Sequence, residues 1–140
     1  MPKMYLLLGS NLGDRAGHLE RARKALDGLF GPALACSGVA ETEAVGFSGP
    51  PFLNQVLCYR TLRRPLTVLR LCKGIEREMG RTDGPEFDAG GRRVYHDRII
   101  DIDILRYGSV ACETPELVLP HPQLRTRAFV APLLAEIERK

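Results

Sequence analysis

The clearest pattern of apolar and polar positions lies at residues 98–105, which read Arg-Ile-Ile-Asp-Ile-Asp-Ile-Leu. Alternation with a period of two, carried by β-branched residues, is typical of a β-strand, in which successive side chains point to opposite faces. Asp101 and Asp103 therefore share one face of the predicted strand. The isoleucines share the other face, which we expect to pack into a core.

The same patterns predict further strands and three helices. Runs of strand-forming residues lie at 4–8, 35–43 and 52–61, with a minor returning strand beginning at 110–111. Apolar residues at helical spacing predict helices that begin after Asp14, at Pro65 and near Arg125. Glycines at 31 and 80 are suited to end the first two helices.

The order of these elements is β-α-β-β-α-β-α, and the short connection between the second and third strands favours antiparallel pairing. This order predicts an α+β fold of the ferredoxin-like type, a mainly antiparallel sheet with helices packed against it. The 140 residues suffice for one domain, and we expect residues 1–140 to form it.

Composition and charge narrow the function classes. The apolar share of 44% and the charged share of 26% are ordinary for a soluble protein, and a net charge of +3 suits a phosphate-bearing ligand without demanding nucleic acid. No apolar run is long enough to predict a membrane span or a signal peptide. The four cysteines lack metal-ligand spacing, and we interpret them as small buried hydrophobes of a cytoplasmic protein.

Two aspartates on one strand face are candidate metal ligands. Their backbone positions are about 6.6 Å apart, so their oxygens can converge on one hard cation or flank two. Magnesium is commonly held by one or two carboxylates together with phosphates and water. The alternative is a solvated strand face, although Asp is depleted in strands. Arg98, at the start of the stretch, is placed to reach an anionic oxygen near such a metal.

Two further polar residues have more than one interpretation. Asn54 lies within a strand pattern and is either an edge decoration or a placed donor and acceptor for a heterocycle. His121 stands between two prolines, which restrict the backbone on both sides. It serves either a structural role or the binding of a phosphate oxygen.

Five motifs occur in a fixed order: Leu-Gly-Ser-Asn-Leu-Gly-Asp at 8–14, Phe-Leu-Asn at 52–54, Ile-Glu at 75–76 with Gly-Arg at 80–81, the stretch 98–105, and Pro-His-Pro at 120–122 with Arg-Ala-Phe at 127–129. As a set, they resemble the 6-hydroxymethyl-7,8-dihydropterin pyrophosphokinase family of folate biosynthesis. The resemblance spans nearly the whole chain.

This resemblance implies transfer of the β,γ-diphosphate of ATP to the hydroxymethyl group of the pterin, with release of AMP, in tetrahydrofolate biosynthesis. It implies two Mg²⁺ ions on Asp101 and Asp103, with Arg81 and Arg98 as further catalytic residues. Implied ATP-binding residues are Glu76, Arg81, Arg98, Ile104, His121 and Arg127. Implied pterin-binding residues are Thr42, Phe52, Asn54, Tyr95 and Phe129. The family also suggests a monomer without nucleic-acid or membrane partners.

Two other functions are compatible with the same order of elements. A ferredoxin-like module that binds a nucleotide or small molecule without catalysis would share the fold, because fold does not determine function. It would give no reason for two aspartates on one strand face. An RNA-binding domain would need exposed aromatic residues and a basic rim, whereas this chain has five Phe, four Tyr and no Trp.

Overall fold

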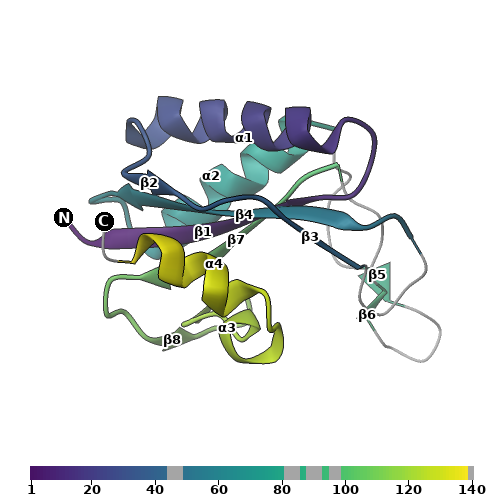
Figure 1. Ribbon diagram of the computed structural model, residues 1–140. Helices are drawn as coiled ribbons and strands as arrows, with labels where there is room; N and C mark the ends of the chain where they lie inside the picture. The colour runs from purple at the N-terminus through teal and green to yellow at the C-terminus, as the bar shows by residue number, and fades with distance from the viewer. Residues whose placement is uncertain (44–48, 81–85, 88–92, 95–98, 139–140) are drawn as a thin grey trace.

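The computed structural model describes residues 1–43, 49–80, 86–87, 93–94 and 99–138. A central sheet separates two layers of helices, with α1 and α2 on one face and α3 and α4 on the other (Figure 1). The helices are α1 (Arg15–Phe30), α2 (Pro65–Glu78), α3 (Gln123–Thr126) and α4 (Val130–Ile137). The central sheet contains β1 (Lys3–Ser10), β2 (Ala35–Cys36), β3 (Ala40–Thr42), β4 (Phe52–Arg60) and β7 (Asp101–Tyr107).

The order of the sheet is β2-β4-β1-β7, with β3 also paired to β4, and every pairing is antiparallel. This is the predicted ferredoxin-like arrangement, in which the first and last strands of the β-α-β-β-α-β unit lie side by side. Two short hairpins lie outside this sheet. They pair β5 (Glu86–Phe87) with β6 (Arg93–Val94), and β8 (Cys112–Glu113) with β9 (Val118–Leu119).

Alternation along the strands divides the core between the two faces. Leu6, Leu8 and the isoleucines of β7 are buried under α1 and α2, whereas Leu7, Val56 and Leu105 are buried under α4. Ile100, Ile102 and Ile104 are at most 4% exposed, which confirms the predicted apolar face. The carboxylates of β7 consequently lie on the opposite face, towards α3 and α4.

The predicted helix boundaries of the first two helices are confirmed. The Asp14 side chain accepts a hydrogen bond of 3.1 Å from the backbone N–H of Gly17, which caps α1. Pro65 occupies the first position of α2, where its missing N–H costs nothing. Gly80 follows the end of α2 with φ of +102°, a conformation that side chains with a Cβ rarely adopt.

Residues 35–43 were predicted as one strand and form two. β2 pairs Cys36 with Leu57, whereas β3 pairs Ala40 with Asn54, so one extra residue lies on this side of the ladder. The hydroxyl of Ser37 accepts a hydrogen bond of 2.8 Å from the Val56 N–H at the interruption. A side-chain acceptor therefore replaces a backbone acceptor, as in a β-bulge.

The predicted last helix, beginning near Arg125, is divided into α3 and α4. Arg127 has φ of −117° and ψ of 112°, which is extended backbone. Pro132 explains the division, because inside one continuous helix its ring would clash with the carbonyl four residues earlier. In the structure Pro132 lies in the first turn of α4, where no such carbonyl is required.

Three smaller predictions also need correction. β7 begins at Asp101, so Ile99 and Ile100 of the predicted strand lie outside it, and the minor strand begins at Cys112. Cys58 and Cys72 are buried as expected, but Cys36 is exposed and Cys112 is only partly buried. Burial raises the pKa of Cys72 to about 12, so this thiol stays protonated.

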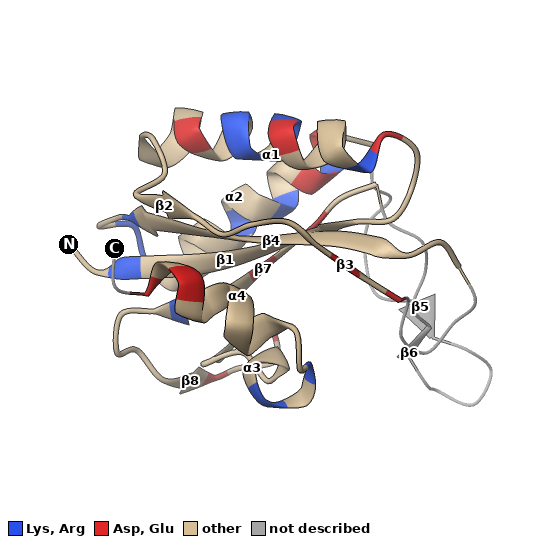
Figure 2. Ribbon diagram, in the orientation of Figure 1, with Lys and Arg blue, Asp and Glu red and all other residues tan. Residues whose placement is uncertain are grey.

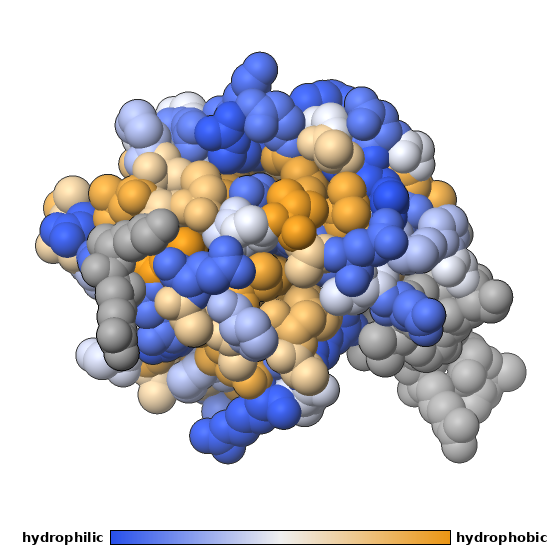
Figure 3. Space-filling view, viewed as in Figure 1, coloured by the Kyte–Doolittle hydropathy of each residue, from blue (hydrophilic) through white to orange (hydrophobic). Residues whose placement is uncertain are grey.

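The surface seen in the orientation of Figure 1 carries both charged and apolar residues. Acidic and basic residues both occur along α1 (Figure 2), and its four basic residues outnumber its two acidic ones. Apolar residues gather over the middle of the molecule in the same view (Figure 3). Leu34 and Val39, beside the short strands β2 and β3, are 47% and 52% exposed. Within the described part of the chain, no helix has the length and apolar character needed to cross a membrane.

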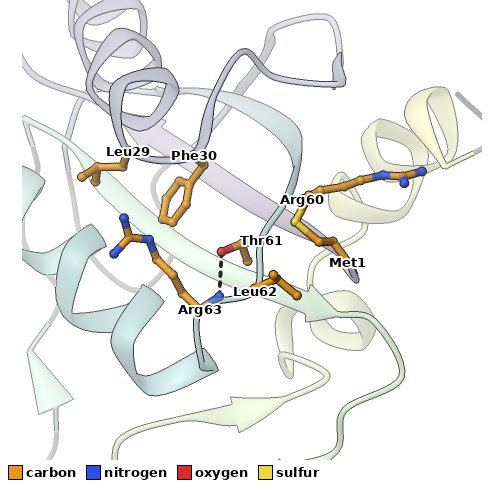
Figure 4. Close-up of a pocket in the computed structure, with 7 residues that line it drawn as sticks. All are labelled: Met1, Leu29, Phe30, Arg60, Thr61, Leu62 and Arg63. Carbon is orange, nitrogen blue, oxygen red and sulfur yellow. Dashed lines mark hydrogen bonds between the residues drawn. The ribbon is translucent and has the colours of Figure 1, made fainter.

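A surface hollow of about 420 Å³ lies at the N-terminal end of β1 (Figure 4). Phe30, at the end of α1, and Leu62 contribute apolar surface, and the Arg63 guanidinium lies 5.9 Å from the centre of the Phe30 ring. The backbone N–H of Arg63 donates to the Thr61 hydroxyl at 3.0 Å, the dashed contact in Figure 4. The predicted site residues belong to the other end of β1.

Candidate active site

Three residues form a row across the central strands at the C-terminal end of β1. Gly9 is paired with Asn54 of β4 on one side and with Asp101 of β7 on the other. Directly paired residues of antiparallel strands direct their side chains to the same face. The row, which we call the cross-strand row, therefore presents an amide, a bare backbone and a carboxylate side by side towards α3 and α4.

Gly9 keeps the middle of this row open. A Cβ at this position would lie 3.3 Å from Asn54 Oδ1 and 3.5 Å from Phe52 Cδ1. The glycine leaves a flat strip of backbone beside an aromatic ring and an amide oxygen. Such a strip is suited to a planar ligand that stacks and forms hydrogen bonds.

Asn54 is a placed amide and not an edge decoration. It is 3% exposed and lies on β4, which is paired on both sides. Its Nδ2 donates to Thr42 Oγ1 at 2.7 Å and to the Ala40 carbonyl at 3.3 Å. These bonds fix the amide with Oδ1 on the side of Gly9.

The two aspartates share the face predicted for them. The Asp103 side chain is 26% exposed, and its Oδ2 accepts a hydrogen bond of 2.8 Å from Gln123 Nε2. Partial burial and the neighbouring Asp101 carboxylate raise the pKa of Asp103, while Gln123 and Arg127 oppose that rise. A bound cation would relieve the repulsion between these two carboxylates, so the pair is suited to bind one.

Glu76 lies behind the aspartates, on the α2 side of β7. It is 4% exposed, and its Oε2 accepts a hydrogen bond of 2.7 Å from the backbone N–H of Ile102. Ile102 is the residue between the two aspartates. Glu76 therefore holds the aspartate strand against α2, and its predicted contact with a nucleotide stays a prediction.

His121 is held beside Asp103 by two hydrogen bonds. Its backbone N–H donates to the Leu105 carbonyl at 2.9 Å, and its Nδ1 accepts from the Gln123 N–H at 3.1 Å. An Nδ1 that accepts leaves the ring proton of a neutral imidazole on Nε2. That nitrogen lies 3.9 Å from Asp103 Oδ1.

Comparison with known proteins decides the family. Residues 5–139 match the family described as 7,8-dihydro-6-hydroxymethylpterin-pyrophosphokinase. The chain belongs to this family.

Three relatives of the chain are each named 2-amino-4-hydroxy-6-hydroxymethyldihydropteridine pyrophosphokinase. The protein of Porphyromonas gingivalis is 45% identical over 98% of this chain and 91% of its own length. The protein of Aquifex aeolicus is 38% identical over 99% of the chain and 81% of its own length. The protein of Bacillus subtilis is 36% identical over 95% and 76%. The match thus extends over nearly the whole chain.

Other residues implied by the family resemblance lie on the same face or outside the described residues. Phe52 is on the face of β4 that carries Asn54, and Phe129 packs against the core under α4. Arg127 follows α3 and acts electrostatically on Asp103. Ile104 is buried, with its side chain on the α2 face. Arg81, Tyr95 and Arg98 lie outside the described residues.

The donor set fits magnesium bound together with a phosphate ligand. Among the described residues, no three His, Cys, Asp or Glu side chains converge as a complete metal site. Asp101 and Asp103 supply hard oxygen donors on one strand face, and both are partly exposed. Magnesium needs only one or two such carboxylates when phosphates and water complete its shell. The pair is thus suited to a metal that arrives with a nucleotide.

Gln123 is the site residue that the sequence analysis missed. It contacts Asp103 through its side chain and His121 through its backbone. Its position two residues after His121 was the only signal available, because a glutamine at the start of a short helix has no chemistry of its own to mark it. Gly9 was noted only as part of a turn motif, and its role emerges from the strand register.

Proposed function

We propose that this chain transfers the β,γ-diphosphate of ATP to the hydroxymethyl oxygen of 6-hydroxymethyl-7,8-dihydropterin and releases AMP, at a site formed by the cross-strand row and Asp103. The observation that carries the proposal is the pairing of Asn54, Gly9 and Asp101 across three strands. This pairing brings the amide proposed to bind the heterocycle and a carboxylate proposed to bind the metal to one face. Membership of the pyrophosphokinase family supports the same reaction.

We propose Asp101 and Asp103 as the ligands of two Mg²⁺ ions. When bound, the ions would neutralise phosphate charge and stabilise the leaving AMP oxygen. Asp103 is held in orientation by Gln123, so the carboxylate need not reorganise on binding. Arg127 and His121 are the proposed phosphate contacts in the described part of the chain. Arg81 and Arg98 are proposed to complete them.

The pterin is proposed to lie over Gly9. Asn54 and Thr42 would bind its polar edge, since the Thr42 hydroxyl already accepts from the Asn54 amide and fixes its orientation. Phe52 and Phe129 are the proposed stacking rings, and Tyr95 is proposed to cover them. A planar ligand above Gly9 would direct its hydroxymethyl group along the row towards Asp101.

Positioning and charge neutralisation would supply most of the catalysis, because diphosphoryl transfer needs no covalent intermediate on the protein. The residues proposed above contain no nucleophile with an activating base. The chain's own proposed contribution is therefore to align the pterin oxygen with the β-phosphorus.

The proposal is tested by measuring AMP release with Mg²⁺ and ATP, with and without the pterin. We expect AMP only when the pterin is present, and a loss of at least about 1,000-fold in Asp103→Ala. Glu41→Gln, on the exposed side of β3, is the control. Binding of ATP and pterin without AMP release would favour the non-catalytic module instead, and release of ADP would contradict the proposed site of attack.

We also propose that the protein acts as a cytoplasmic monomer on these two small molecules. The scattered, unpaired cysteines support a reducing compartment, since none of the four forms a disulfide. The monomer rests on the family resemblance. Sedimentation at working concentration would test it, and a stable dimer would overturn it.

A further inference from the structure

We propose that Gln123 is a positioning residue that sets the orientation of both Asp103 and His121, and so prepares the metal and phosphate contacts before the nucleotide binds. This inference deepens the proposed function and rests on it for the identity of the ligand. It is carried by two hydrogen bonds from one residue to two candidate ligand-binding side chains.

The first bond acts on the carboxylate. Gln123 Nε2 donates to Asp103 Oδ2 at 2.8 Å, while Oδ1 stays on the side of His121 at 3.9 Å. A donor on one oxygen fixes the rotation of the carboxylate and leaves the remaining lone pairs for a cation. Because the amide is neutral, it neither competes with the metal, as an arginine would, nor repels the carboxylate, as a glutamate would.

The second bond acts on the imidazole. The backbone N–H of Gln123 donates to His121 Nδ1 at 3.1 Å, so a neutral ring carries its proton on Nε2. Nε2 is the nitrogen nearest to Asp103. One residue at the start of α3 thus orients a metal-ligating oxygen and a phosphate-binding N–H that face each other.

A purely structural role does not account for the glutamine. Its Oε1 is buried and has no hydrogen-bond partner in the described part of the chain. An unpaired buried carbonyl opposes folding, whereas an apolar side chain of similar length would avoid this penalty. Retaining an amide here is explained if its Nε2 is needed by Asp103.

The test compares the parent with Gln123→Met, which keeps the side-chain length and the backbone N–H but removes the amide. Binding of Mn²⁺ is followed by electron paramagnetic resonance in the presence of a non-hydrolysed ATP analogue. We expect Mn²⁺ to bind about 10–100-fold more weakly in Gln123→Met. The thermal midpoint of the metal-free protein should not fall, and the ring ¹⁵N shifts of His121 should keep their tautomer pattern.

Gln55→Met is the matched control. Gln55 also donates through Nε2 to a single oxygen, the Ser37 carbonyl at 2.9 Å, but it does so on β4 away from the aspartates. This variant should bind Mn²⁺ as the parent does. If Gln123→Met does not fold, Gln123→Asn is measured in the same way, since its shorter amide cannot keep the same contact.

Equal Mn²⁺ affinity in the parent and in the folded Gln123 variant would overturn the inference. So would an equal loss in Gln55→Met. Neither result depends on AMP release, because the metal measurement uses a nucleotide that is not cleaved. If the parent protein releases no AMP, the proposed function is contradicted. The comparison of Mn²⁺ affinities would still decide the role of Gln123.

Discussion

A single missing side chain shapes the site as much as the charged residues do. Gly9 has no side chain, so the face of the sheet is bare at the middle of the cross-strand row. A Cβ there would crowd Asn54 Oδ1 and the Phe52 ring. Side chains on either side of it supply the amide and the carboxylate. The row therefore works as a surface only with glycine at its centre.

Gly9→Ala should weaken pterin binding without unfolding the protein. The added methyl group would occupy the space between Asn54 and Phe52. Because this space is where the pterin is proposed to lie, we expect a rise of roughly 10–100-fold in the KM for the pterin, with little change in the KM for ATP. Gly28→Ala, where a Cβ meets nothing within 4 Å, is the control. An unchanged pterin KM in Gly9→Ala would contradict the proposal that the pterin lies over Gly9.

Asp103→Asn should make the metal-free protein more stable at neutral pH while abolishing activity. Burial and Asp101 raise the pKa of Asp103 in the folded state, so the folded state binds this proton more tightly than the unfolded chain. The parent should therefore lose stability as pH rises from about 4, the unfolded pKa, to the raised folded value. The slope in this window is at most about 1.4 kcal/mol per pH unit for this group.

Urea unfolding of parent and variant across this pH range checks the sign. The loss of stability with rising pH should be smaller in Asp103→Asn. A steeper loss in the variant, or a variant less stable than the parent at pH 7, would mean that the carboxylate is not destabilised by its surroundings.

Between elements, one buried carboxylate connects α2 to the aspartate strand. Glu76 accepts from the N–H of Ile102, the residue whose neighbours on both sides are the proposed metal ligands. Ile102 is 4% exposed, so its N–H is shielded from water and depends on this acceptor. This hydrogen bond therefore fixes the position of both aspartates relative to α2.

Replacing Glu76 with Leu should destabilise the protein by about 1–3 kcal/mol, because the Ile102 N–H would lose its acceptor. Glu76→Gln keeps a side-chain acceptor and should recover most of that loss. Denaturant unfolding of the metal-free proteins measures both. Equal stability of the parent and Glu76→Leu would show that the bond contributes nothing to the packing of α2 on β7.

The elements differ in how far local chemistry predicts them. A strand across the two aspartates and the ends of α1 and α2 followed from alternation, Asp14, Pro65 and Gly80, because each of these signals acts within a few residues. Alternation did not give the bounds of that strand, which was predicted at 98–105 and is found at 101–107. The interruption at Ser37 depends on a hydroxyl that replaces a backbone acceptor of β4, and no local pattern reveals that. The break before α4 follows from a local signal, because Pro132 would clash with a carbonyl inside one continuous helix. The helical spacing of the apolar residues does not contain this signal.

Over the whole molecule, the topology explains why the site residues are far apart in the sequence. β1 lies between β4 and β7, so residues 9, 54 and 101 meet only after the sheet has formed. Alternation alone predicted the shared face of the two aspartates. The strand pattern singled out Asn54 with two open interpretations, and the predicted pterin contacts of Asn54 and Thr42 came from resemblance to the family. The contacts of Gln123 required the structure, since strand register and long-range contacts are not written in local spacing.

The same topology separates the two ends of the sheet. Gly9 and Lys3 are about 20 Å apart along β1, with the proposed site at one end and the arginine-lined hollow at the other. Both ends contain basic side chains that could attract phosphate. A measurement that distinguishes them tests the location of catalysis directly.

That measurement is the broadening of backbone amide resonances by Mn²⁺ bound with a non-hydrolysed ATP analogue. The account predicts strong broadening at Gly9, Asp101 and Gln123, and sharp signals at Phe30 and Leu62 around the hollow. Asp103→Ala should remove the broadening. Selective broadening around the hollow, or none at the cross-strand row, would contradict the claim that the two aspartates of β7 hold the metal and the nucleotide.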